Sequence, residues 1–397
     1  MINNHSSMLT MLHPNAAIIE GNILRIDRKF LLGMGAYANN ISIPIATVHP
    51  EAKPESFIMD LVSVPLSELP YLVLVLKTDR SGELPPLERA RLQSQLAKSR
   101  LVYGGGFGSS RFCREHGIPQ IRVLETDLRS QIVVSTSAVS SPLRKFVRCI
   151  RIISSYLQDI YSLSKAARLH CNGYPAYFET RFFNTDRLLY LDSRMSMADI
   201  ISEADLERRL ASNVNRPLRL LFSGRFEPLK GAVDCVRVGI ECLRMGVDIE
   251  MHCFGQGSQS NEMKHLANES GCGKIYVHDA ISFPELVERS REFDIFVCCH
   301  IQSDPSCTYL ESFGSALPIV GYSNRMWRHL QRHSGVGSTA PIGNYKLLAA
   351  HVKKYSIERD SLGQHSTLAR AFAVEHCFES EFKKRTDDIN AYLLTGR

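Results

Sequence analysis

Two successive alternations of short apolar runs and longer amphipathic segments constrain this chain more than any other feature. In the first half, apolar runs that predict strands lie at 16–24, 43–48, 71–76, 101–103 and 120–125. Segments with helical periodicity separate them at 27–40, 87–98 and 109–116. Strands that alternate with helices form parallel sheets whose two faces the helices cover. We therefore predict an α/β fold built on buried parallel sheets.

The alternation starts again after 213–217, Asn-Val-Asn-Arg-Pro, which has the composition of a domain boundary. Predicted strands follow at 218–222, 249–254, 274–278, 293–299 and 318–322, with helices at 232–245, 262–270, 284–292 and 305–316. Between the halves, 143–169 and 197–212 are predicted helices and 170–195 is a predicted loop-rich stretch. We predict an N-terminal domain over 1–213, a C-terminal domain over 214–376 and a last helix within 377–397. Two Rossmann-like, doubly wound domains would bind ligands in a central cleft between the carboxyl ends of their strands.

The composition is that of an ordinary globular protein, with 44% hydrophobic and 22% charged residues. The net charge of +6 suits anionic partners, but no zinc-ligand spacing or Arg/Gly-rich tail indicates nucleic acid, so we expect no nucleic-acid partner. The N-terminus lacks the pattern of a signal peptide, and no apolar run approaches the ~20 residues of a membrane span. The eleven cysteines lack zinc or CxxC spacing and indicate buried free thiols, which fits a cytoplasmic protein.

The segment 222–231, Phe-Ser-Gly-Arg-Phe-Glu-Pro-Leu-Lys-Gly, joins a predicted strand to a predicted helix. Gly224 permits a sharp turn and a close approach to a ligand. Arg225 and Lys230 place two cations beside a helix N-terminus, where free N–H groups already favour an anion. A planar guanidinium and a mobile ammonium together suit a diphosphate, although a solvated Arg and Lys on a surface loop would look the same in sequence. The patterns G-x-G-x-x-G and G-x4-G-K-[ST] are absent, which argues against a nicotinamide enzyme and a Walker loop.

A second segment, 303–318, follows the predicted strand at 293–299. Asp304 is followed by a proline, as at the N-cap and first position of a helix. The free N–H groups of Ser306, Cys307 and Thr308 would then face the cleft as a second anion site. Glu311 lies further along, where its carboxylate can accept hydrogen bonds from two neighbouring sugar hydroxyls. Alternatively, Asp304 is only a cap and Glu311 lies on an exposed helix face.

The order and spacing of these two segments resemble glycosyltransferase family 4, the group 1 transferases, over roughly 216–380. Segments 254–257 and 278–286 extend the resemblance and bring Gly255 and Ile281 to the donor side. The resemblance implies the GT-B fold. It also implies that Arg225 and Lys230 contact the diphosphate of a nucleotide-sugar donor and that Glu311 holds its ribose. The family's first paired glutamate falls at Ser303, beside Asp304, and its usual glycine before the motif's proline is Ala316.

The N-terminal half resembles the family less closely. Segment 24–35 stands in place of its glycine-rich first loop. Many members carry a histidine after a central strand, where this chain reads Leu-Glu-Thr-Asp at 124–127, so Glu125 becomes a candidate contact to the reacting sugar. Asn172 lies in a loop that could line the acceptor side of the cleft. The helix around 379–394 resembles the family's terminal helix, which crosses back onto the first domain.

The resemblance implies retaining transfer of a hexose from a nucleotide-sugar to a glycan or lipid-linked acceptor, as in bacterial surface polysaccharide or glycolipid synthesis. The cations and helix amides would stabilise the charge that grows on the leaving diphosphate. That role makes a metal unnecessary, and no D-x-D pair lies at a predicted strand end, so we expect no metal and no cofactor. Three alternatives stay open: an epimerase or phosphorylase on the same scaffold, a non-catalytic nucleotide-sugar-binding protein, and a non-enzymatic membrane-surface protein.

The segment 142–168 has a separate signature. Apolar residues recur at spacings of four and three, namely Phe146, Ile150, Ile153, Leu157 and Ile160. Arg144, Arg148 and Arg151 fall on the opposite face of the helix. Such a helix could lie on anionic lipid at the inner face of the cytoplasmic membrane. It could equally pack its apolar stripe on the first sheet and leave its basic face in water.

Overall fold

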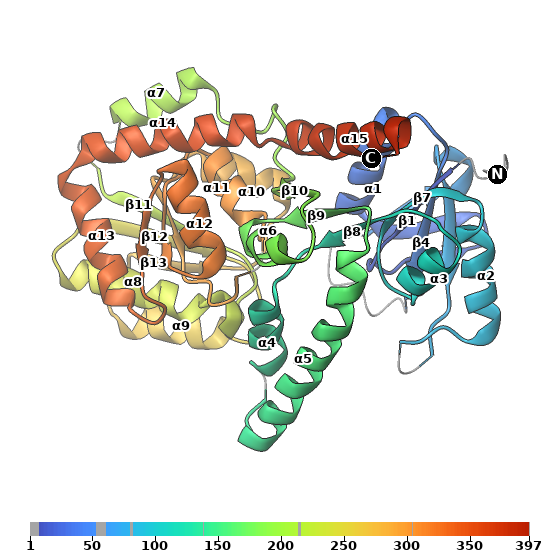
Figure 1. Ribbon diagram of the computed structural model, residues 1–397. Helices are drawn as coiled ribbons and strands as arrows, with labels where there is room; N and C mark the ends of the chain where they lie inside the picture. Colours follow the sequence, from blue (N-terminus) through green and yellow to red (C-terminus); the bar gives the residue numbers. More distant parts are fainter. Residues whose placement is uncertain are drawn as a thin grey trace.

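The computed structural model describes residues 8–52, 61–79, 82–137, 139–212, 216–303 and 305–396. Within these ranges the chain forms two α/β domains, each centred on one parallel sheet (Figure 1). The prediction of two doubly wound, Rossmann-like domains is confirmed. The predicted boundary falls at Asn213 to Asn215, outside the described residues.

The first domain is centred on seven strands in the order β10-β9-β8-β7-β1-β4-β6, and all of the strand pairs are parallel. These strands are β1 (Met8–Leu12), β4 (Ile45–Pro50), β6 (Leu72–Leu76), β7 (Ser99–Gly104), β8 (Gln120–Leu124), β9 (Arg168–Asn172) and β10 (Arg187–Tyr190). The chain adds strands on one side of β1 up to β6 and then crosses to the other side with β7. Open α/β sheets leave a crevice at such a switch point, beyond the carboxyl ends of the strands.

Helices connect the strands of the first domain. They are α1 (Arg28–Asn40), α2 (Pro86–Leu96), α3 (Ser109–Glu115), α4 (Leu128–Thr136), α5 (Pro142–Ser164), α6 (Tyr174–Glu179) and α7 (Glu203–Ser212), with the 3-10 helices η2 (Leu66–Glu68) and η3 (Thr180–Phe182). Asp27 caps α1 as predicted, because its carboxylate accepts the Phe30 N–H at 3.2 Å. A small antiparallel sheet of β2 (Ile18–Glu20), β3 (Ile23–Asp27) and β5 (Leu61–Pro65) completes this domain.

The second domain has six parallel strands in the order β13-β12-β11-β14-β15-β16. They are β11 (Leu218–Ser223), β12 (Ile249–Phe254), β13 (Ile275–His278), β14 (Ile295–Cys298), β15 (Ile319–Tyr322) and β16 (Ser338–Ala340). The helices are η5 (Pro228–Lys230), α8 (Ala232–Arg244), α9 (Ser260–Glu269), α10 (Phe283–Ser290), α11 (Thr308–Gly314), α12 (Arg325–Ser334), α13 (Tyr345–Ile357) and α14 (Arg359–Glu375). This strand order is that of dinucleotide-binding sheets, and its switch point lies between β11 and β14.

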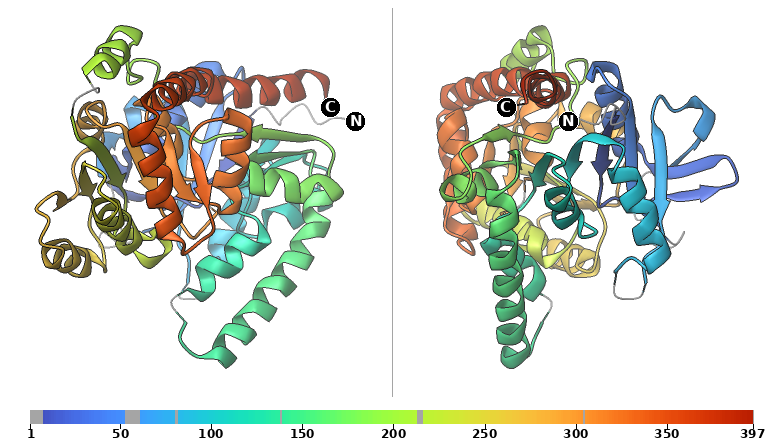
Figure 2. Two further views of the ribbon diagram at one scale, coloured as in Figure 1. Left: turned by 90° about the vertical axis from the view of Figure 1, so that its left-hand side faces the viewer. Right: turned by 45° about the vertical axis from the view of Figure 1, so that its right-hand side comes forward.

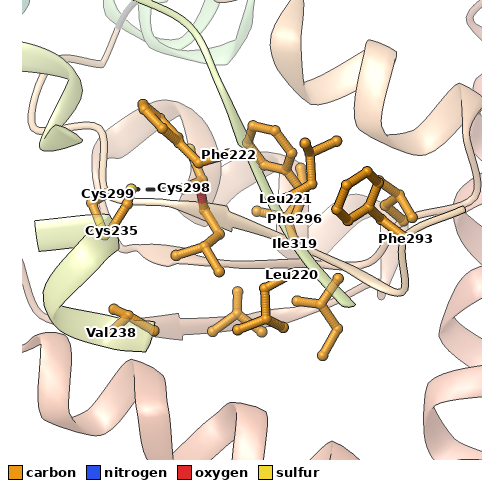
Figure 3. Close-up of a cluster of buried hydrophobic side chains, with 14 of the residues drawn as sticks. Leu220, Leu221, Phe222, Cys235, Val238, Phe293, Phe296, Cys298, Cys299 and Ile319 are labelled. Atoms are coloured by element: carbon orange, nitrogen blue, oxygen red, sulfur yellow. Dashed lines mark hydrogen bonds between the residues drawn. The ribbon is translucent and has the colours of Figure 1, made fainter. Parts of the chain in front are cut away.

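The core of the second domain explains why its strands are easy to recognise in the sequence. Leu220, Phe222, Phe296 and Ile319 come from three neighbouring strands and are fully buried (Figure 3). A parallel sheet with helices on both faces buries successive residues, so its strands read as continuous apolar runs. The eleven cysteines are all free thiols and most of them are buried, as predicted.

The last helix, α15 (Phe378–Thr395), leaves the second domain and packs on the first (Figures 1 and 2). Phe382, Ile389 and Leu393 belong to the first domain's core. A side-chain carbon added to Gly33 of α1 would lie 3.0 Å from the Phe382 ring, so the two helices meet closely at that glycine. The last helix of the sequence is therefore a structural part of the first domain.

The start of the chain differs from the sequence prediction. The run at 16–24 was predicted as the first strand, but it contributes to the β2–β3 hairpin of the small sheet. The first strand of the main sheet is β1, whose five residues include a polar Thr10. The Thr10 hydroxyl is buried against the Ser99 hydroxyl at 2.6 Å, a pairing that no local pattern reveals. The loop after the first strand is consequently 13–17, and not 24–35.

The prediction that 170–195 is a loop-rich stretch is also wrong. The stretch contains the end of β9, then α6, η3 and β10. Both strands carry arginines or other polar residues, because they lie toward the edge of the sheet and contact α15. Their sequences therefore lack the apolar run that marks a central strand. Within the described part of the chain, no helix combines the length and apolar character that crossing a bilayer requires.

Candidate functional site

The loop after β11 is held by backbone hydrogen bonds to the loop after β12. The Gly224 N–H donates to the Phe254 carbonyl at 3.1 Å, and the Phe226 N–H donates to the Gln256 carbonyl at 2.9 Å. A side-chain carbon on Gly255 would lie 1.9 Å from the Gly224 carbonyl oxygen, so the loops meet backbone to backbone. Between these anchors, Arg225 is exposed. The predicted Gly224, Arg225 and Gly255 thus come together at the carboxyl edge of the sheet.

Lys230 ends the short helix η5 on the same edge and is buried. Gly231 follows with φ of +60°, and a side-chain carbon there would lie 2.1 Å from the Cys299 carbonyl oxygen. This contact joins the loop after β11 to the end of β14 across the switch point. Sequence reasoning missed His300, which follows β14 and is buried. Neither of its ring nitrogens forms a hydrogen bond with the residues described. Burial, with the Lys230 charge, holds the His300 pKa well below its ordinary value, so the ring is neutral.

The segment after β14 departs from its prediction. Asp304 lies outside the described residues, and the helix expected from Pro305 begins three residues later, at Thr308. Cys307 occupies the N-cap position, and the Ser306 hydroxyl donates to the Thr308 hydroxyl at 3.0 Å. The Asp-Pro pair was therefore a misleading helix signal. Of the amides of 306–308, only that of Thr308 belongs to the helix, and the anion site expected on these three amides stays a prediction.

Asn324 fixes this segment from the next loop along the sheet. Its amide donates to the His300 carbonyl at 3.0 Å and to the Tyr309 hydroxyl at 3.1 Å, and its side-chain oxygen caps α12. Ser303, where the resembling family has its first paired glutamate, accepts the Arg325 N–H at 3.0 Å. The side chain at position 303 thus has a structural contact in this chain.

Ala316 stands where the resembling family usually has glycine. Its φ is +53°, in the left-handed region that favours glycine, and the residue is fully buried. The buried Arg209 donates to the Ser315 and Ala316 carbonyls at 2.8 and 2.7 Å. These hydrogen bonds hold the turn after α11 although alanine is not the preferred residue there.

Glu311 is buried, in contrast to the alternative that placed it on an exposed helix face. The Arg194 guanidinium donates to its carboxylate at 2.6 Å and lies 4.1 Å from the centre of the Phe283 ring. Ile281, the other predicted residue on this side, is partly buried and packs against the second domain's core. A donor ribose at Glu311 would therefore share the carboxylate with Arg194.

The carboxyl ends of the two sheets meet through several charged contacts. Lys29 of α1 pairs with Asp192, which follows β10, and also donates to the Cys307 sulfur of the second domain at 3.1 Å. Burial lowers the Lys29 pKa, but the Cys307 sulfur and the Asp192 carboxylate together hold it above its ordinary value. Burial raises the pKa of the Cys307 thiol to about 12, so the thiol stays protonated.

A second contact between the domains centres on Arg325, at the start of α12. Its guanidinium pairs with Asp127, the N-cap of α4, and lies 3.8 Å from Glu179 of α6. A side-chain carbon on Gly173 would lie 3.0 Å from Pro305 and 2.9 Å from the Met326 sulfur. These residues follow β8, β9, β14 and β15, so the two sheets present their carboxyl edges to each other.

The two tentative residues of the first domain have different settings. Glu125 is exposed and lines a cavity of about 370 Å³ at the carboxyl edge of the first sheet. Asn172 is buried, and its side-chain oxygen accepts the Asp192 N–H at 3.0 Å. Asn172 thus positions Asp192, whereas the contact of Glu125 with a sugar stays a prediction. Among the described residues, no three His, Cys, Asp or Glu side chains gather as metal ligands would.

Comparisons with known proteins identify the fold. Neither a protein-family model nor a curated protein matches this sequence. HepE from Anabaena in complex with UDP-glucose matches with a TM-score of 0.66 at 12% identity, over 97% of this chain and 99% of that chain. Sucrose-phosphate synthase from Thermosynechococcus elongatus matches with 0.65 at 11% identity, over 98% and 100%. WaaG, a glycosyltransferase involved in lipopolysaccharide biosynthesis, matches with 0.64 at 12% identity, over 96% and 99%. The protein therefore has the two-domain GT-B fold of glycosyltransferases.

Proposed function

We propose that this protein is a glycosyltransferase that moves a sugar from a nucleotide-diphosphate sugar to a glycan or lipid-linked acceptor. The observation that carries the proposal is the switch point of the second sheet. There, a glycine-anchored loop presents Arg225 and Lys230, and Glu311 lies on the helix that follows β14. Open α/β sheets bind nucleotides at this point of their topology.

The donor diphosphate would bind on the loop after β11. Lys230 is buried beside His300, whose neutral ring adds no second charge to repel it. A buried ammonium acts strongly on a phosphate, because little water screens it. As the bond from the anomeric carbon to the diphosphate breaks, negative charge grows on the leaving phosphate and positive charge on the sugar ring. Arg225 and Lys230 would stabilise the first change, so we propose that transfer needs no metal.

The stereochemistry and the pathway are further parts of the proposal. We propose retention of configuration, with the acceptor attacking from the face that the diphosphate leaves. HepE was crystallised with UDP-glucose and WaaG takes part in lipopolysaccharide biosynthesis, which supports UDP-sugars as the first donors to test and surface polysaccharide or glycolipid as the acceptor class.

A transfer assay separates this function from its alternatives. The protein is incubated with labelled UDP-, GDP- and ADP-sugars and a mixture of glycan and lipid-linked acceptors, with and without EDTA. We expect label in the acceptor with release of nucleoside diphosphate, unchanged by EDTA. Isomerised donor without transfer would identify an epimerase, and donor binding without turnover would identify a nucleotide-sugar-binding protein.

We propose in addition that α5 docks on an anionic membrane surface. The helix extends away from the body of the first domain, with α4 beside it (Figures 1 and 2). Of its residues, all of which the structure describes, Leu163 alone is buried. Phe146 is 63% exposed and Leu157 is 61% exposed, so the apolar stripe does not pack on the first sheet.

The charged residues of α5 indicate that the membrane surface it would bind is anionic. Arg144, Arg148 and Arg151 are exposed and line a groove of about 490 Å³ near the first turns of the helix. A helix with an exposed apolar stripe on one face and cations on the opposite face fits the interface of anionic lipid, where each basic residue near the surface contributes about 1 kcal/mol. This surface would bring the first domain to a lipid-linked acceptor at the cytoplasmic face of a membrane.

Liposome flotation tests the docking. We expect the protein to float with vesicles that contain phosphatidylglycerol, to float less as salt rises, and not to float with phosphatidylcholine alone. Changing Arg144, Arg148 and Arg151 to Gln should abolish flotation. The matched control changes three exposed arginines on other helices, Arg111, Arg208 and Arg237, to Gln and should leave flotation intact. Equal flotation of both triple variants would reject α5 as the membrane surface.

A further inference from the structure

The first sheet has a cavity at its own switch point. The cavity of about 370 Å³ is lined by the loops after β1 and β7, by α1 and by α15. Its size lies within the roughly 300–1,000 Å³ of small-molecule sites. Gly104 has φ of +93° there, and a side-chain carbon added to it would lie 2.3 Å from the Leu12 carbonyl oxygen. Because glycine has no such carbon, the two loops can approach each other closely at this position. The topology that predicts a ligand crevice and the observed cavity therefore coincide.

Three cations line this cavity, and two of them are neutralised. Lys29 pairs with Asp192. Arg122 pairs with Asp159 through two hydrogen bonds of 3.1 Å. For the third, Arg385 of α15, no carboxylate of the described residues lies within ion-pair distance. Burial lowers the pKa of Arg385, but three neighbouring tyrosines and the Asp192 carboxylate hold it above its ordinary value, so the guanidinium is charged. Because this buried cation forms no ion pair with a described carboxylate, an anionic ligand would supply the direct counter-charge that it lacks.

The setting of Arg385 leaves one side of its guanidinium for a ligand. The guanidinium carbon lies 3.9 Å from the centre of the Phe382 ring and 4.4 Å from that of Tyr190. Nε donates to the Glu381 carbonyl at 3.1 Å, and Nη1 donates to the Tyr37 hydroxyl at 3.2 Å. Nη2 has no hydrogen-bond partner among the residues that the structure describes. The side chain is thus held by two aromatic rings and two hydrogen bonds, while Nη2 remains available to a ligand.

A chain of buried hydrogen bonds continues from Tyr37 and determines which group donates in each bond. Since Tyr37 accepts from Arg385, its hydroxyl can donate to Tyr103, 3.1 Å away, which in turn can donate to His170 Nδ1 at 3.2 Å. His170 Nε2 then donates to Asp388 at 2.9 Å, and Asp388 pairs with Arg168. The tyrosine hydroxyls are therefore occupied within the protein.

The cavity has a second unpaired polar atom and one exposed acid. Within the described part of the chain, His13 Nε2 lacks a hydrogen-bond partner. Burial, with the neighbouring His49, lowers the His13 pKa to about 3, so the ring is neutral. Glu125 also lines the cavity, but it is exposed, so water and salt screen its charge far more than that of the buried Arg385.

We propose that this cavity binds a negatively charged group of the acceptor, a phosphate or a carboxylate, on the Nη2 side of Arg385. That the ligand is the acceptor rests on the function proposed above, whereas the anion site itself is inferred from the cavity and the Arg385 guanidinium. A guanidinium binds carboxylate and phosphate oxygens through directed, charge-assisted hydrogen bonds. Neutral His13 would meet a hydroxyl of the same ligand. The substrate class is thus a sugar phosphate, a lipid-linked phosphate or an acidic sugar.

Direct binding measurements test this site without any transfer reaction. The protein used is the full chain with Arg225→Ala and Lys230→Ala, so that the donor loop does not bind the phosphate. Calorimetry compares glucose 6-phosphate, glucuronate and glucose. We expect glucose 6-phosphate, glucuronate or both to bind about tenfold or more tightly than glucose, and the one that binds more tightly identifies phosphate or carboxylate as the group. Arg385→Met should remove the preference over glucose.

Two further variants keep the test decisive. Arg100→Met removes an arginine that hydrogen-bonds the Leu393 carbonyl of the same helix but does not line the cavity, and it should change nothing. If Arg385→Met does not fold, Arg385→Lys must retain a weaker preference for the charged ligand. Equal affinity for glucose and both charged probes, or a preference that survives Arg385→Met, would overturn the proposal. If either of these results is found while the protein still transfers sugar to a neutral acceptor, this site is rejected and the transferase function stands.

Discussion

The two domains have the same sheet topology but place different chemistry at their switch points. In the second domain, the residues that meet there come from short loops, are held by glycine backbones, and include Arg225 and Lys230. In the first domain, the corresponding cavity is lined by tyrosines and by Arg385, which comes from the far end of the chain. A backbone-built loop suits a diphosphate, which all nucleoside-diphosphate sugars share. A cavity built from side chains suits an acceptor, whose structure is particular to each enzyme.

The glycine at the end of the donor loop offers the largest expected effect. Gly231→Ala should lower the free energy of unfolding by about 3 kcal/mol, because the methyl group would collide with the Cys299 carbonyl and the backbone is left-handed. Gly246→Ala is the matched control, since Gly246 has φ of +76° with no atom within 4 Å, and it should cost about 1 kcal/mol. Urea unfolding measures both, and equal costs would show that the loop has room at Gly231.

The next effect concerns turnover. Arg225→Ala and Lys230→Ala should each lower kcat by about 100-fold with little loss of stability, because contacts to a leaving group strengthen in the transition state. Arg225→Lys should also be slow, since the planar fork is lost. Steady-state kinetics with a melting curve for each variant check this. Unchanged turnover in either alanine variant would remove that residue from the mechanism.

Acid should weaken the first domain through its buried histidines. Burial lowers the His49 pKa to about 4, and the unfolded chain binds this proton near pH 6.5. Stability should therefore fall as pH drops from about 6.5 to 4, by about 2 kcal/mol between pH 6.5 and 5 for this group. His49→Asn can keep the hydrogen bond to the Asn15 carbonyl and should flatten the slope. The exposed His265→Asn should not, and urea midpoints at several pH values decide.

The smallest effect sharpens the role of Glu311. Glu311→Gln should weaken binding of the matching nucleoside diphosphate by about tenfold, since a carboxylate that accepts ribose hydroxyls makes charge-assisted hydrogen bonds. Because Arg194 also pairs with Glu311, the double variant with Arg194→Gln is needed. Affinity that stays low in the double variant assigns Glu311 to the ribose. Affinity that recovers would assign the loss to an unpaired Arg194.

The second domain was largely predictable because its signals are local. Its strands are continuous apolar runs, and Gly224, Arg225 and Lys230 lie within one short segment. Prediction failed where the signal was ambiguous, as at Asp304-Pro305, which has the residue types of a helix start although α11 begins at Thr308.

The first domain was less predictable because its site is assembled from distant parts of the chain. Lys29, Asp192 and Cys307 meet across the domain interface, and Arg385 reaches the cavity from α15. Of these residues, only Cys307 lies in one of the two motif segments. For α5, the sequence showed the apolar stripe and the arginines, but only the structure shows that the stripe is exposed.

Nucleotide binding tests most directly the claim that the donor belongs to the second domain and the acceptor anion to the first. Calorimetry with UDP, then GDP and ADP, should find one nucleotide that binds the unmodified protein. Lys230→Ala should weaken that binding by about tenfold or more, whereas Arg385→Met should leave it unchanged. An equal loss in both variants, or a loss only in Arg385→Met, would contradict this division of the two domains.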